Sequence, residues 1–119
     1  MFTTYLYMRI GVNRIQMRNI SNGESVDLFA ETSFSHSRML IGNFTEAQVL
    51  IKKAVASAKG SGLQLFLRIL IHPTELVTGG LTQIEERVLY ELAHGAGAGK
   101  TFIWLGPALS DEEVKSKLL

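Results

Sequence analysis

The sequence contains no cysteine, which excludes disulfides, zinc sites built on thiolates and thiol catalysis. A reducing compartment such as the cytosol suits a chain of this kind. An excess of charge of one sign is also lacking, because 12 Lys and Arg balance 11 Asp and Glu to a net charge of +1. Such a balance creates no field that would recruit nucleic acid or an acidic membrane surface, so we expect neither as a partner.

Long hydrophobic runs are missing as well. The longest, from Leu65 to Ile71, is interrupted by Arg68 and is too short to cross a bilayer. The first residues, MFTTYLYMRIGVNR, lack the basic segment before an apolar run that is typical of a signal peptide. We therefore expect no integral membrane segment and a cytoplasmic protein.

The composition that remains is typical of a folded domain. Of the 119 residues, 46% are hydrophobic and 19% are charged, which separates the chain from disordered sequences. This length is sufficient for one domain with a hydrophobic core but not for two. No internal repeat or low-complexity tract divides the sequence, so we predict a single domain at residues 1–119.

Alternation of apolar and polar side chains in the N-terminal quarter predicts three short strands, at residues 2–10, 14–20 and 25–30. In the first strand, Leu6 and Ile10 occupy one face and Arg9 occupies the other. Asn22-Gly23 lies between the second and third strands and predicts a type I′ turn, which needs positive φ at both positions. The three strands are therefore expected to form an antiparallel meander.

Helices and strands are expected to alternate through the rest of the chain. Each of three helices is predicted to begin with a capping box, at Thr45/Gln48, Thr82/Glu85 and Ser110/Glu113. Apolar runs at Leu63–Ile71 and Thr101–Leu105 predict the two strands between them. The order βββαβαβα, a meander followed by right-handed crossovers, indicates an α/β fold of the ribonuclease H-like class with a five-stranded mixed sheet.

The second predicted helix carries apolar residues at helical spacing. They indicate a buried stripe formed by Leu81, Ile84, Val88 and Leu92. The glycine-rich sequence GAGAGKT that follows is not a phosphate-binding loop, because position 94 is histidine where that motif needs glycine. The order helix, loop, strand is also the reverse of what phosphate binding at a helix N-terminus requires. We interpret the glycines as a helix cap and tight turn.

The segments TQIEERVL and HGAGAGKTFI, at residues 82–89 and 94–103, resemble the bacterial actin-like family of MreB. YLYMRIGVNRIQMRNI is similar to the first hairpin of that family, IGNFTEAQVLIKKAV to its first core helix, and RILIHP to the strand before its catalytic helix. The resemblance covers nearly the whole chain, but it corresponds to subdomain IA alone.

The resemblance also implies where a nucleotide site would lie. In the MreB family, the first glutamate of the Thr-Gln helix positions the attacking water, and the matching residue here is Glu85. The phosphate loop corresponds to Arg9, Gly11 and Asn13, with Arg9 in place of the aspartate that serves magnesium. The second domain of the nucleotide clamp has no counterpart. We therefore expect a degenerate, non-catalytic subdomain that binds no cofactor or metal.

Two functions follow from this interpretation. The first is an interaction or assembly module, linked to the bacterial cell-shape cytoskeleton, that binds a protein partner or another copy of itself. Its expected surface consists of Arg9, Gly11, Asn13, Thr82 and Glu85.

The alternative function is a small metal-dependent hydrolase or nuclease of the same fold, in which Glu85 acts with Glu75 or Asp27. The three histidines lack the spacing of metal ligands, so this alternative depends on the carboxylates.

Overall fold

The computed structural model describes residues 3–60 and 66–119. Its elements, in chain order, are β1 (Thr3–Gly11), β2 (Arg14–Asn19), β3 (Ser25–Phe29), α1 (Phe44–Ala58), β4 (Phe66–Pro73), α2 (Gln83–Gly95), β5 (Lys100–Ile103) and α3 (Asp111–Leu118). The predicted order βββαβαβα is confirmed. The predicted start of the fourth strand, at residues 63–65, lies outside the described residues.

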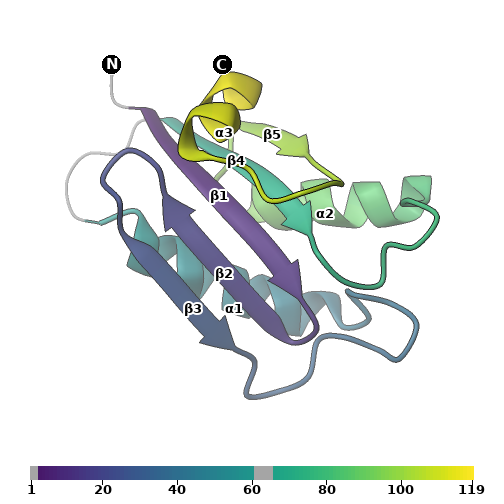
Figure 1. The fold of residues 1–119 in the computed structure, drawn as a ribbon. Coiled ribbons are helices and arrows are strands. Elements are labelled where there is room, and N and C mark those ends of the chain that lie inside the picture. Colours follow the sequence, from purple (N-terminus) through teal and green to yellow (C-terminus); the bar gives the residue numbers. More distant parts are fainter. Residues whose placement is uncertain (1–2, 61–65) are drawn as a thin grey trace.

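The five strands form one mixed sheet, as the sequence predicted, and their order across it is β3-β2-β1-β4-β5. β1, β2 and β3 pair in antiparallel fashion, whereas β4 lies parallel to both β1 and β5. Helices α1 and α2 cover one face of the sheet, and α3 lies across the other (Figure 1). The face under α1 and α2 is called the inner face below, and the face under α3 the outer face.

The alternation of β1 distributes its side chains between two hydrophobic clusters. Leu6 and Ile10 point to the inner face and are fully buried in the larger cluster, against α1 and α2. Tyr7 points to the outer face and packs in a smaller cluster with Val114 and Leu118 of α3. Burial on both faces is expected for a strand at the centre of a covered sheet.

The start of α1 differs from the prediction. The helix begins at Phe44 after Asn43, with no side-chain capping bond, so the predicted Thr45/Gln48 capping box is wrong. The Gln48 side chain is used elsewhere, because its Nε2 donates to the carbonyl of Leu92 in α2 at 3.1 Å. A tertiary bond between two helices has replaced the local one.

The loop between β2 and β3 also differs. Gly23 has a positive φ of 82°, but Asn22 does not, so the predicted type I′ turn is wrong. The side chain of Asn19 organises the loop instead, since its Oδ1 accepts from the backbone N–H groups of Ser21 at 2.9 Å and Asn22 at 3.2 Å. A longer loop closed by a side chain does not need two residues with positive φ.

Candidate functional site

Three segments meet at one edge of the sheet. The parallel strands β1 and β4 end there at Gly11 and Pro73, and the chain then turns through residues 74–82 into α2. Ligands of open α/β sheets bind outside the carboxyl ends of parallel strands, which makes this edge the candidate site. The predicted residues Arg9, Gly11 and Asn13 lie on the β1–β2 hairpin, while Thr82 and Glu85 lie at the start of α2.

The hairpin turn is engaged with the chain itself at Asn13. This residue has a positive φ of 53°, which asparagine tolerates better than most side chains. Its Oδ1 accepts from the backbone N–H groups of Phe34 and Ser35, both at 2.9 Å, and from the Ser33 hydroxyl at 3.1 Å. The predicted phosphate-loop asparagine therefore holds the segment that leads to α1.

A carboxylate of the chain also covers the turn beside Gly11. The backbone N–H of Val12 donates to Oε1 of Glu75 at 2.9 Å. A Cβ at position 11 would lie only 2.7 Å from the same oxygen, so close approach of this carboxylate requires glycine there. The Val12 N–H donor at the turn is therefore occupied by a side chain of the chain itself.

Arg9 lies on the outer face, half-buried, and its Nη2 donates to Oε1 of Gln16 at 3.4 Å. It lines a hollow of about 310 Å³ over β2 and β3, and a second of about 330 Å³ beside His72. The carboxylates of Asp27 and Asp111 pair with Arg14 and Arg18, whereas Arg9 has no ion pair with any described residue.

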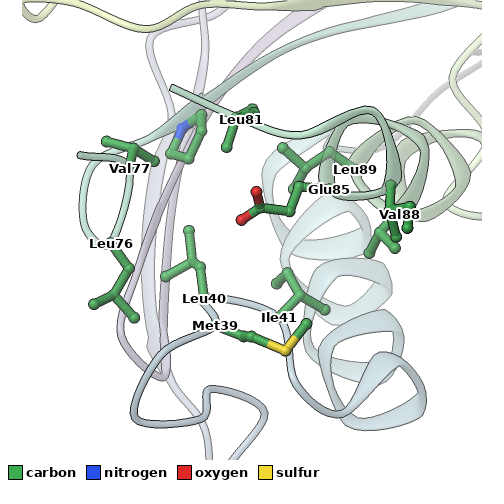
Figure 2. Close-up of a pocket in the computed structure, with 11 residues that line it drawn as sticks. Met39, Leu40, Ile41, Leu76, Val77, Leu81, Glu85, Val88 and Leu89 are labelled. Carbon is green, nitrogen blue, oxygen red and sulfur yellow. The ribbon is translucent and has the colours of Figure 1, made fainter. Parts of the chain in front are cut away.

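Glu85 forms the predicted capping box with Thr82. The Thr82 N–H donates to Glu85 Oε1 at 2.9 Å, and the Glu85 N–H donates to Thr82 Oγ1 at 3.1 Å. The carboxylate also stands in the wall of an apolar pocket of about 40 Å³ that we call the α2 groove (Figure 2). The other lining residues are Met39, Leu40, Ile41, Pro73, Leu76, Val77, Leu81, Ile84, Val88 and Leu89.

The buried stripe of α2 was predicted wrongly at one position, Ile84. Leu92 is fully buried as expected, but Ile84 is 74% exposed and Leu89 is buried in its place. Leu81 and Val88 are partly buried and line the α2 groove. Ile84, which was expected in the core, is therefore an exposed apolar side chain beside Glu85.

The acids of the hydrolase alternative do not converge. Glu75 bonds to the hairpin turn, Glu85 caps α2, and Asp27 pairs with Arg14 on the outer face. The Arg14 guanidinium lowers the pKa of Asp27 through that hydrogen bond. Within residues 3–60 and 66–119, no group of three or more acids or histidines could hold a metal ion.

The GAGAGKT segment contains the end of α2, with Gly97 at a φ of 105°, and the start of β5.

One polar relay was not predicted from the sequence. The Tyr7 hydroxyl donates to Nδ1 of His72 at 2.7 Å, and Nε2 of His72 donates to the carbonyl of Gly106 at 2.8 Å. Leu109 completes the relay by donating its N–H to the Tyr7 oxygen at 3.2 Å. Burial lowers the pKa of His72, which favours the neutral ring that this arrangement needs. The relay fixes the segment before α3. Tyr7 and His72 lie on the neighbouring strands β1 and β4 without being register partners, so no sequence signal pointed to the relay.

The fold defines a class. The structure of MreB5 of Spiroplasma citri bound to ADP superimposes on 87% of this chain with a TM-score of 0.59 and 12% sequence identity. This chain spans 38% of the length of that protein. The similarity identifies the fold as an actin-like, ribonuclease H-like subdomain, in agreement with the prediction.

Sequence comparison defines the family. The uncharacterized protein YjaA of Escherichia coli (strain K12) is 33% identical over 97 residues, which cover 76% of this chain and 75% of YjaA. The chain therefore belongs to the YjaA family. No protein-family model matches it. Among the described residues, no helix has the length and hydrophobicity needed to cross a membrane.

Proposed function

We propose that this chain is a non-catalytic actin-like subdomain that works as a protein-interaction module. The observation that carries the proposal is the occupied hairpin turn, where the Val12 N–H already donates to Glu75. A nucleotide phosphate bound at the turn would have to displace an internal carboxylate and then be stabilised in a site that Asn13 has folded against residues 33–35.

The position of Arg9 supports the same proposal. By the sequence resemblance, Arg9 takes the place of the aspartate that serves magnesium in the MreB family, and an arginine repels a divalent cation. A phosphate could pair with Arg9, but an isolated cation without metal or water-positioning groups does not hydrolyse it. Glu85, the remaining candidate for water positioning, accepts the Thr82 N–H and faces apolar side chains.

The partner that we propose is a protein. The fold is one that in MreB5 forms part of a larger chain bound to ADP, and this chain spans 38% of such a length. A domain of this fold is suited to contact either cytoskeletal proteins of related fold or another copy of itself. A role in the assembly of the cell-shape cytoskeleton is the form of this proposal that follows from the resemblance.

Calorimetric titration with magnesium ATP tests the non-catalytic part of the proposal. We expect no binding in the micromolar range and no release of phosphate from the wild-type chain. A double variant, Arg9→Asp with Glu75→Ala, restores an acid on β1 and frees the Val12 donor, so it serves as the matched comparison. Micromolar binding with turnover by the wild type would overturn the proposal.

A further inference from the structure

Three large apolar side chains stand exposed around the α2 groove. Ile84 is 74% exposed, Met39 46% and Leu76 41%. They come from three separate segments, since Ile84 lies on α2, Met39 lies before α1 and Leu76 lies in the loop after β4. Figure 2 shows Leu76 and Met39 on different sides of the groove. Single exposed apolar residues are ordinary, but a set that converges on one apolar hollow is typical of an interaction site.

The backbone at Leu76 adds to this pattern. Leu76 has a positive φ of 58°, a conformation that is uncommon for a bulky side chain. Such conformations cluster at ligand clamps and binding loops, where the surrounding structure maintains them. Here the strained residue lines the groove instead of packing fully into the core.

Glu85 gives the groove a specific charge. Among the described residues that line it, Glu85 is the only charged one. Its Oε1 accepts from Thr82, and no basic side chain of the described residues pairs with the carboxylate. The carboxylate stands in the wall of an apolar hollow, where it is placed to pair with a cation that a partner carries.

We propose that the α2 groove docks a protein segment that carries apolar side chains together with one Lys or Arg, which pairs with Glu85. This inference rests on the proposed function and names the chemistry of the partner. The volume of the groove, about 40 Å³, is far below the roughly 300 Å³ of the smallest typical small-molecule sites. It suits the tips of one or two apolar side chains from an amphipathic helix, with the cation placed at the rim.

Peptide display on the purified full chain tests the inference. A library of random peptides of about sixteen residues, roughly four helical turns, is selected for binding to the wild type. Selected peptides are then titrated against Ile84→Asp and against Val49→Asp, which places the same charge at a residue of α1 that is 60% exposed and outside the groove. Glu85→Gln removes the charge of Glu85 and keeps a side chain that a capping box accepts.

The expected result is enrichment of peptides with apolar residues at helical spacing and one Lys or Arg. Ile84→Asp should weaken their binding about 100-fold, as substitutions at interface centres do. Val49→Asp should leave it unchanged. Glu85→Gln should weaken binding of the basic peptide about tenfold. When the Lys or Arg of the peptide is itself replaced by Gln, Glu85→Gln should weaken binding of that peptide no further.

Peptide binding that survives Ile84→Asp but is lost in Val49→Asp would overturn the proposal that the α2 groove is the docking site. The proposed interaction module would still stand. Failure to select any peptide whose binding depends on Ile84 would also overturn the proposal that the α2 groove is the docking site. If the wild type sediments as a dimer and Ile84→Asp dissociates it, the α2 groove binds a second copy of the chain. That result would overturn the proposal that the groove docks a basic segment of a partner. The nucleotide titration described above decides the proposed function separately from all three outcomes.

Discussion

Helices α2 and α3 begin with the same hydrogen-bonded device in opposite surroundings. Thr82 and Glu85 form a capping box at α2, and Ser110 and Glu113 form one at α3. At α3 the box is followed by Val114, which is fully buried. The residue that follows the box of α2 is the exposed, charged Glu86. The apolar contact that normally accompanies a capping box is therefore available only at α3.

The chain before each helix shows the same contrast. The segment before α3 is held by the relay of Tyr7 and His72, which bonds to Gly106 and Leu109. The loop before α2 is anchored at its start, where Glu75 accepts from the Val12 N–H, but it then contains Leu76 with a positive φ and exposed apolar surface. The start of α3 is therefore packed into the fold, whereas the start of α2 leaves apolar side chains such as Ile84 and Leu76 exposed.

The largest effect should come from truncating Val114, the buried residue after the box of α3, and little effect from truncating Ile84, the exposed residue inside the box of α2. Val114→Ala removes two buried methyl groups and should lower the free energy of unfolding by about 2 kcal/mol. Ile84→Ala changes a side chain that is 74% exposed and should alter it by less than about 0.5 kcal/mol. Urea denaturation measures both values. Equal losses would show that Ile84 supports the fold and would remove the contrast.

A smaller effect is expected from the capping residues themselves. Ser110→Ala and Thr82→Ala each remove the side-chain oxygen that accepts a backbone N–H, and each should cost about 1 kcal/mol. Hydrogen exchange of the first-turn amides should show faster opening at the substituted helix alone. If Thr82→Ala has no effect on either measurement, the capping box does not stabilise the start of α2 and does not hold the carboxylate of Glu85 in place.

The sequence predicted these two boxes because the whole signature lies within four residues. The same signature at Thr45 and Gln48 failed, since bonds from Gly42 and Asn43 to the carbonyl of Phe34 set the chain before α1 and Gln48 reaches α2. The order of the elements could be predicted in full, because it depends on alternation and helical spacing along the chain. Contacts between distant residues had no such local signal.

The contacts of the candidate site had no local signal in the sequence. Gly11 and Glu85 stay predicted site residues, and Glu75, the partner of the hairpin, lies 63 residues from Val12. Helical spacing alone also could not separate the stripe through Ile84 from the buried one through Leu89, because both are apolar. Which of them faces the core is decided by the packing of α2 on α1 and the sheet.

Acidification should weaken the anchored start of α3 through His72. Burial places the pKa of His72 in the folded chain below its ordinary value of 6.5, so the unfolded chain binds the proton first. The contribution of the neutral ring is complete above about pH 6.5 and is lost as the pH falls through the folded pKa. Urea denaturation over this range should show the loss in the wild type and in His94→Gln, whose histidine is exposed, but not in His72→Gln. Identical profiles for all three proteins would contradict the role of the relay.

The smallest effect should be the titration of Glu113. The N–H of Ser110 donates to Glu113 Oε1 at 3.0 Å, and this bond lowers the pKa of the carboxyl from its ordinary value of 4.5. The folded chain therefore releases the proton more readily than the unfolded chain, so the stabilisation is present above about pH 4.5 and is lost as the pH falls through the folded pKa. Melting temperatures between about pH 3 and pH 7 should decrease less steeply for Glu113→Gln than for the wild type, because glutamine keeps the box without titrating. An unchanged slope would show that the box of α3 is held by the apolar contact of the partly buried Leu109 with the buried Val114, and that the charge of Glu113 adds nothing to it.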